Sequence, residues 1–268
     1  MNKLTKSIIM LTICILTLTY KKAYAQDNYT NLELLIENKK KQETLKEKIN
    51  YLEDSINQKE KYIGQNEDNK IKQEEIVSIS FIANNEYTNK NEDEIKNLQL
   101  TKENLEHELE NLLIDSVQIE KIIEEETKKY LDSNNLEYIK GIWPLKSYVE
   151  ISSEFGERVH PITKEVKFHK GVDIPAPEST DILSSDDGIV VFSGIQNGYG
   201  NVVKIKHFDG KNTVYAHNSY NIAKEGDIVK KGQVIAKVGS TGVSTGNHVH
   251  FEVIVNGENI NPNDSVNK

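Results

Sequence analysis

The ten residues Ser244–Val253, STGNHVHFEV, place two histidines one residue apart directly after a glycine-containing loop. The run from His248 onward has the apolar, β-branched character of a buried strand, in which alternate side chains point to the same face. His248 and His250 therefore share one face of the strand. Two protonated imidazoles in one pocket repel each other, and a bound cation resolves this because it requires neutral ligands. The alternative is a pair of stacked or surface histidines that hold no metal.

A second motif, HKGVD at His169–Asp173, sets a histidine and an aspartate four residues apart with Gly171 between them. Both side chains can face one ion from a tight turn that leads into a strand, although this spacing alone also arises by chance. Together with the two histidines above, it offers nitrogen, nitrogen and oxygen ligands, the pattern of a catalytic zinc site with one open position. His217, which follows Tyr215-Ala216 at a strand end, is a candidate for a supporting or acid–base role, or is a plain turn histidine.

Composition narrows the classes of partner. The 268 residues carry a net charge of -9, which argues against nucleic acid, whose phosphates attract clusters of Lys and Arg. The single cysteine, Cys14, lies in the apolar N-terminal segment. Once that segment is removed, any metal must be held by nitrogen and oxygen ligands.

Residues 1–25 have the pattern of a signal peptide. Lys3 and Lys6 precede an uncharged, mostly apolar run, Ser7–Tyr20, which is shorter than the roughly 20 residues of a bilayer span. Ala23-Tyr24-Ala25 then provides the small residues of a cleavage site. We predict export to the cell envelope, outside the cytoplasmic membrane. Lys21-Lys22, directly after the apolar run, leaves an uncleaved anchor as the alternative.

Residues 26–140 predict a helical coiled coil. This half has no proline, one glycine, and 27 acidic against 16 basic residues. Its apolar residues recur at steps of four and three, the 3.5-residue repeat of a coiled-coil seam, in two runs. The first run is Leu45, Ile49, Leu52, Ile56 and Ile63, and the second is Ile95, Leu98, Leu105, Leu109, Leu112, Ile119 and Ile123. The polar segment Ala83–Asp93 predicts a break between them, hence an antiparallel hairpin. A parallel dimer of long helices is the alternative.

Residues 141–268 predict an all-β, mainly antiparallel domain, which makes the chain α+β as a whole. All five prolines and fourteen of the fifteen glycines fall here, between short β-branched runs such as GNVVKIKHF and HVHFEVIV. Trp143-Pro144 marks the start of the domain, since proline ends helices and tryptophan is a natural core residue.

From residue 143 to about 262 the chain resembles the lysostaphin-type, or LytM-type, zinc metallopeptidases. The matching segments, in the family's order and spacing, are ISSEFGERVHPIT (151–163), FHKGVDIPAPEST (168–180), DGIVVFSG (187–194), GYGNVVKIKH (198–207), TVYAH (213–217), GDIVKKGQVIAKVGSTG (226–242) and STGNHVHFEV (244–253). The resemblance implies Zn²⁺ as the cofactor, with His169, Asp173 and His250 as its ligands. It also implies that His217 and His248 are catalytic.

Our candidate general base is His248, and His217 would stabilise the tetrahedral intermediate or donate a proton to the leaving amine. The sequence alone leaves open which histidine has which role. Two departures from the family pattern, Asn247 and Asn218, remove no ligand. His160 and His207 match no functional position and are expected to be structural.

The function expected from this resemblance is a secreted, zinc-dependent endopeptidase that cuts the peptides of bacterial cell-wall peptidoglycan. Glycine bridges and stem-peptide cross-links both remain possible substrates. The coiled coil is expected to dock on a membrane-protein partner and restrain the peptidase, or to act as a plain spacer. The alternative function is a non-catalytic envelope adaptor or an activator of another wall hydrolase.

Overall fold

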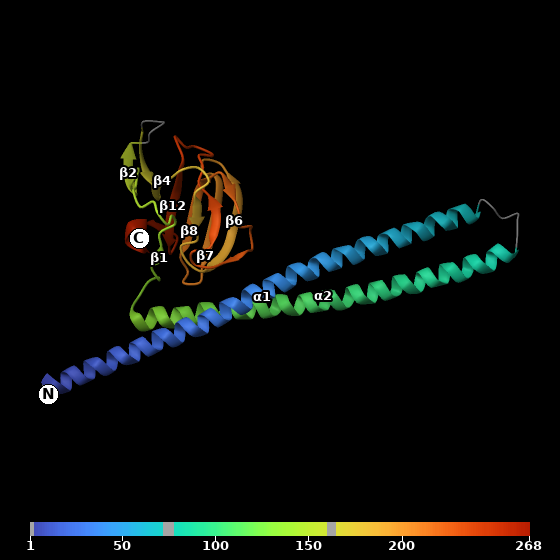
Figure 1. Cartoon of the computed structure of the whole chain (residues 1–268), viewed down its shortest axis with the longest axis horizontal. Coiled ribbons are helices and arrows are strands. Elements are labelled where there is room, and N and C mark those ends of the chain that lie inside the picture. The colour runs from blue at the N-terminus through green and yellow to red at the C-terminus, as the bar shows by residue number, and fades with distance from the viewer. Residues whose placement is uncertain (1–2, 72–77, 160–164) are drawn as a thin grey trace. The chain divides into compact units, whose positions relative to one another are not determined.

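The structure is a computed structural model that describes residues 3–71, 78–159 and 165–268, with side chains described for 30–65, 91–159 and 165–268. Long helices precede a β-sheet domain (Figure 1), which confirms the predicted α+β class. The chain forms two compact units, one of Leu32–Ile119 and one of Met1–Asn31 with Glu120–Lys268. The elements are α1 (Lys3–Ile71), α2 (Ser78–Asn134), β1 (Gly141–Ile142), β2 (Gly156–Val159), β3 (Val166–His169), β4 (Val172–Pro175), β5 (Asp181–Leu183), β6 (Gly188–Gln196), β7 (Gly200–His207), β8 (Asn212–Asn218), β9 (Tyr220–Asn221), β10 (Ile228–Val229), β11 (Val234–Lys237), β12 (His248–Val255), β13 (Glu258–Ile260), α3 (Pro262–Ser265) and β14 (Val266–Asn267).

The unit Leu32–Ile119 is an antiparallel hairpin of α1 and α2. Several of the predicted seam residues are buried between the helices, namely Leu45, Ile49, Ile56, Ile95 and Ile119. Gln42, also buried in this seam, donates from Nε2 to Leu112 O at 3.0 Å and to Ser116 Oγ at 2.8 Å. These contacts join the two helices within one chain, so the hairpin needs no second chain to cover its seam.

The predicted break at Ala83–Asp93 is wrong, because α2 begins at Ser78 and continues through this segment. The segment contains neither proline nor glycine, and each asparagine costs a helix less than about 1 kcal/mol relative to alanine. A run of asparagines therefore need not end a helix. Along the described residues, we find no helix both long and apolar enough to cross a membrane. The predicted signal peptide falls on side chains outside the described ones.

The β domain is organised around a seven-stranded sheet. Its strands follow the order β10-β6-β7-β8-β12-β13, and β4 pairs with β12 as a seventh member. All these pairs are antiparallel. Three smaller sheets accompany it: β5-β11-β9, the β2-β3 hairpin, and a parallel pair of β1 with β14. Strand β12 thus lies inside the large sheet, between β8 and β4.

The alternation of β12 separates the core from a polar face. Val249, Phe251 and Val253 are fully buried in the main hydrophobic core. Trp143 packs edge-on against Phe251, with ring centroids 6.3 Å apart, and joins the same core as the sequence predicts. His248, His250 and Glu252 occupy the alternate positions and therefore point to the opposite face. Strand β12 therefore holds these polar side chains in place, because its other face packs in the hydrophobic core.

Candidate metal centre and active site

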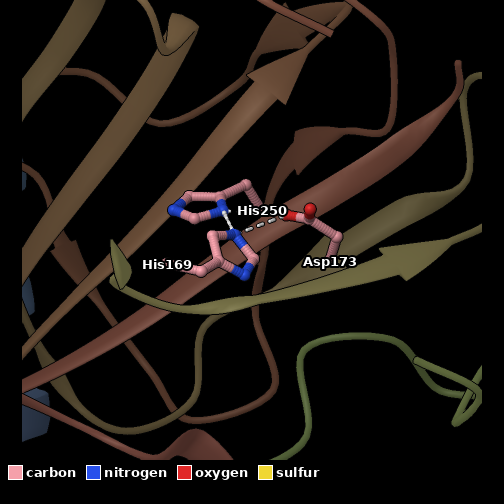
Figure 2. Close-up of side chains that lie close together, drawn as sticks. All are labelled: His169, Asp173 and His250. Atoms are coloured by element: carbon pink, nitrogen blue, oxygen red, sulfur yellow. Dashed lines mark hydrogen bonds and ion pairs between the residues drawn. The ribbon is translucent and has the colours of Figure 1, made fainter. Parts of the chain in front are cut away.

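Three side chains from separate strands converge on one point beside β12. His169 ends β3, Asp173 lies in β4, and His250 lies in β12 directly opposite Asp173 in the strand register. His250 Nδ1 is 2.8 Å from Asp173 Oδ1 and 3.0 Å from His169 Nε2, and the last two atoms are 3.2 Å apart. All three residues are buried, and Figure 2 shows their side chains pointing toward one another.

Gly171 allows the turn between two of these residues. A Cβ atom at this position would lie 2.2 Å from the carbonyl oxygen of Phe251 in β12, a distance that no side chain tolerates. The turn can therefore press against β12 only because residue 171 is glycine. This close approach brings His169 and Asp173 to the same side of β12.

Outer partners set the tautomers of both histidines. His169 Nδ1 lies 2.8 Å from the carbonyl oxygen of Glu154, an acceptor, so Nδ1 carries the proton and Nε2 presents a lone pair. His250 Nε2 lies 3.0 Å from the buried carboxylate of Glu252, so Nε2 donates and Nδ1 faces the cluster. When Nδ1 of His250 carries no proton, two imidazole nitrogens and one carboxylate oxygen point their lone pairs at a common centre.

The donor set fits a divalent metal such as zinc. Ligand atoms held at about 2.0–2.2 Å in tetrahedral geometry lie roughly 3.3–3.6 Å apart, so the observed separations require only a small outward adjustment. A buried donor set that lacks protons is costly unless a cation compensates it. Among the described residues, His169, Asp173 and His250 each offer one ligand atom, and these atoms lie close enough together to hold one metal ion.

The pKa shifts of Asp173 and His250 indicate where the protons of this cluster lie when no metal is bound. Burial raises the pKa of Asp173, but hydrogen bonds from His169 and His250 outweigh it and hold the pKa below its usual range. Burial lowers the pKa of His250, yet hydrogen bonds to Asp173 and Glu252 raise it to about 9. A metal-free chain therefore holds a proton on Nδ1 of His250 at neutral pH, and metal binding must displace it.

Two more histidines flank the triad. His248 Nε2 is 3.6 Å from Asp173 Oδ1, and the rings of His217 and His248 have centroids 4.8 Å apart. His248 Nδ1 lies 2.8 Å from Gly246 O, and His217 Nδ1 lies 2.8 Å from Thr241 O. Both Nδ1 atoms therefore donate to carbonyl oxygens, which leaves both Nε2 atoms as proton acceptors while the rings are neutral.

His217 reaches the site through an unusual backbone. In β8, Tyr215 is buried in the main core, and strict alternation would turn His217 to that same side. Instead His217 has φ 63°, in the left-handed region that costs a non-glycine residue on the order of 1 kcal/mol or more. Burial lowers the pKa of His217 to about 4, and the nearby His248 lowers it as well, so the ring is neutral at pH 7.

A cavity of about 480 Å³ opens over these residues. Its wall includes all five histidine and aspartate side chains described above, together with Tyr199, Glu252 and three basic residues, Arg158, Lys167 and Lys170. Tyr199 donates its hydroxyl proton to Glu252 Oε1 at 2.8 Å, and burial together with the charge of Glu252 raises the pKa of Tyr199. Asn259 donates to Glu252 Oε2 at 3.0 Å, so this buried carboxylate is fully engaged.

The sequence reasoning brought forward all five converging residues but missed Glu252, Tyr199 and Arg158. Glu252 could have been found, because it follows His250 by two positions and must share its face. Of the histidines read as structural, His207 is buried and bonds Asp187 O at 3.0 Å and Thr213 Oγ1 at 2.7 Å, away from the site. His160 lies outside the described residues.

The part of the chain that contains these five residues is similar to known proteins. Residues 167–262 match the sequence model of peptidase family M23. Over 115 residues the chain is 48% identical to the DD-carboxypeptidase/endopeptidase Mpg of Neisseria meningitidis serogroup B, covering 43% of this chain and 26% of that protein. Over 144 residues it is 38% identical to the peptidoglycan DD-endopeptidase ShyC of Vibrio cholerae, covering 53% and 33%. The chain thus spans about a quarter to a third of the length of these curated relatives.

Among solved structures, the catalytic domain of the antimicrobial peptidase lysostaphin from Staphylococcus simulans is 32% identical. The match covers 43% of this chain and 90% of that domain, with a TM-score of 0.40.

Proposed function

We propose that this chain, whose residues 167–262 form a domain of peptidase family M23, is a zinc-dependent endopeptidase that hydrolyses peptide bonds of bacterial peptidoglycan. The observation that carries the proposal is the convergence of His169, Asp173 and His250 beside two further histidines whose Nε2 atoms are proton acceptors. The family consists of zinc metallopeptidases, and the two curated relatives are a DD-carboxypeptidase/endopeptidase and a peptidoglycan DD-endopeptidase. All five residues that the activity needs are present in this chain.

His169 Nε2, Asp173 Oδ1 and His250 Nδ1 would hold the zinc ion. When bound, zinc supplies Lewis acidity, which polarises the scissile carbonyl and lowers the pKa of water. His248 lies beside the triad and takes a proton from the attacking water at Nε2. The same Nε2–H then donates that proton to the leaving amine as the carbon–nitrogen bond breaks.

His217 has a different part in this proposal. Its neutral ring offers only an acceptor at Nε2, because Nδ1 is bonded to Thr241 O. It therefore orients the attacking water, or the scissile N–H, by accepting a hydrogen bond. Stabilisation of the tetrahedral intermediate by His217, one of the roles considered from the sequence, fits less well, since a neutral Nε2 has no proton to donate.

The substrate bond that we propose lies between D-amino acids in the peptidoglycan peptides. Support comes from the relatives' names, DD-carboxypeptidase/endopeptidase and DD-endopeptidase, at 48% and 38% identity. This choice favours stem-peptide bonds over glycine bridges. Export by the N-terminal signal would bring the enzyme to such a substrate in the cell envelope.

The helical hairpin is proposed to position or regulate the peptidase through a partner, which we expect to be a membrane protein. The motivation is a long, acidic hairpin whose seam is already filled within the chain, leaving its outer faces for another protein. Wall-digestion rates of the full chain and of residues 141–268 would separate regulation from spacing. Equal rates in the two proteins would leave no role for restraint by the hairpin.

The proposed activity is tested by zymography on purified cell wall, with His250→Ala as the inactive control. The wild type should clear the wall, a chelator should stop it, and added zinc should restore it. Mass spectrometry of the released fragments would identify the bond. A zinc-loaded wild type that clears no wall but still binds it would favour the alternative, a non-catalytic envelope adaptor or an activator of another hydrolase.

A further inference from the structure

The β2–β3 hairpin places two basic residues on the same face as a metal-site residue. In this hairpin Arg158 lies directly opposite Lys167, and Gly156 lies opposite His169. Residues directly opposite each other share a face, and so do residues two apart along a strand. Arg158, Lys167 and His169 therefore project from one face of the hairpin, and all three line the cavity.

This pairing is unfavourable for folding alone, because like charges directly opposite each other destabilise a sheet. Lys167 has a partner in Glu165 at 3.1 Å, but their side chains are 48% and 68% exposed, and ion pairs between exposed side chains contribute little to stability. An anion bound between Arg158 and Lys167 would offset the repulsion between these two cations. A ligand anion is therefore the natural occupant of this part of the cavity.

Arg158 has further N–H donors that can bind such an anion. Its Nη2 lies 3.4 Å from Asp173 Oδ2, the carboxylate oxygen that does not face the two imidazoles. A guanidinium group carries five N–H donors in a planar fork that suits a carboxylate, and one contact uses only one of them. Its side chain is 26% exposed, so the remaining donors can reach the cavity.

The charge balance of the cavity also favours an anionic ligand. Three basic side chains and two carboxylates line it, and the carboxylate of Glu252 is already hydrogen-bonded to His250, Tyr199 and Asn259. With a divalent ion held by Asp173 and its partners, the wall is net positive. This contrasts with the whole chain, which carries -9. A positive cavity in an acidic protein attracts anionic substrates.

We propose that Arg158 and Lys167 form a carboxylate-binding subsite that selects peptides with a free α-carboxylate next to the scissile bond. This inference rests on the proposed function. The residue that supplies the scissile carbonyl has its own α-carboxyl group in the bond, so only the residue on the leaving side can carry a free one. Arg158 and Lys167 thus favour terminal bonds and cross-links whose leaving residue keeps its carboxylate. Bonds inside a glycine bridge lack that anion and are disfavoured.

The test uses two synthetic peptides ending in D-alanyl-D-alanine, identical except that one has a C-terminal carboxylate and the other a C-terminal amide. The zinc-loaded full chain should cleave the acid with kcat/KM about tenfold or more above the amide, the size expected of charge-assisted hydrogen bonds. Added salt should reduce this preference. Lys167→Gln and Arg158→Gln should each lower it, by raising KM for the acid more than KM for the amide. Arg158→Lys should retain part of it.

Lys224→Gln, at an exposed lysine outside the cavity wall, is the matched control and should leave the preference unchanged. Zinc content is measured for every variant. If Arg158→Gln loses zinc and slows both peptides equally while Lys167→Gln is silent, Arg158 acts only through Asp173 and the subsite is refuted.

Equal cleavage of acid and amide by the wild type would also overturn the subsite, while peptidase activity itself would stand. If neither peptide nor purified wall is cleaved, the proposed function fails, and calorimetric binding of the two peptides still decides the subsite. Equal dissociation constants for acid and amide would then reject it.

Discussion

Nε2 of His250 lies 3.0 Å from Oε1 of Glu252, two residues further along β12, and both side chains are buried. This contact holds His250 in the tautomer that turns Nδ1 toward the other metal-site residues. Partners of this kind usually change metal affinity by 10–100-fold when they are replaced. Glu252→Gln should therefore weaken zinc binding by about 10–100-fold, measured by competition with a chromophoric chelator.

Glu258→Gln, at an exposed position on β13, is the control for this change of charge and should bind zinc like the wild type. Unchanged zinc affinity in Glu252→Gln would show that β12 alone orients His250.

Substitutions of two neighbouring histidines should separate metal binding from turnover. His250→Ala removes a proposed ligand and should abolish stoichiometric zinc binding along with activity. His217→Ala removes only a proposed hydrogen-bond acceptor that orients the water or the scissile N–H, so zinc should remain while kcat falls by roughly 10- to 100-fold, the size of one hydrogen bond lost in the transition state. Metal analysis and wall-digestion rates on the same samples provide both readouts. Normal turnover in His217→Ala would remove His217 from the mechanism.

The stability of the β domain should depend on pH through His207. Burial lowers the pKa of His207 to about 4, and the nearby charge of Lys211 lowers it as well. Because the unfolded chain then binds more protons between about pH 6.5 and 4, the free energy of unfolding falls as pH drops across this window. The loss attributable to His207 is about 3 kcal/mol.

His207→Gln should lack this part of the pH dependence. Urea unfolding at pH 7 and pH 4 for both proteins gives the difference, which isolates His207 from the other titrating groups. Parallel pH profiles in the two proteins would contradict a neutral, buried His207.

The hairpin of α1 and α2 should depend on Gln42, whose amide bonds Leu112 O and Ser116 Oγ inside the seam. Gln42→Ala removes the donor of both hydrogen bonds and should lower the free energy of unfolding of the hairpin by about 1–3 kcal/mol. Gln58→Ala, at an exposed position of the same helix, makes the same change in helix propensity and serves as the control. Equal midpoints in circular dichroism melts of the two variants would show that the seam does not need this hydrogen bond.

Periodicity predicted much of this fold. The 3.5-residue repeat located the seam residues of the hairpin, and two-residue alternation placed His248 and His250 on one face. It failed at Ala83–Asp93, because turn-forming asparagines have only a weak effect on a long helix. Alternation would also have turned His217 toward the core, and only its positive φ brings it to the site. Such a backbone reversal leaves no trace in residue type or spacing.

Pairing between strands decides the position of Arg158, which the sequence did not reveal. Arg158 faces the cavity because β2 pairs with β3 in a register that sets it opposite Lys167. Nothing local to either residue reveals that pairing. Glu252, by contrast, follows from the same alternation as its neighbours, and a search for carboxylates two residues from a candidate ligand would have found it.

His169, Asp173 and His250 are proposed to hold one zinc ion together. X-ray absorption spectroscopy of the zinc-loaded full chain, with elemental analysis of the same sample, would decide whether they do. We expect one zinc per chain in a shell of nitrogen and oxygen only, lost in His169→Ala, Asp173→Ala and His250→Ala alike. A wild type that retains no zinc, or any of these three variants that keeps a full zinc complement, would contradict it.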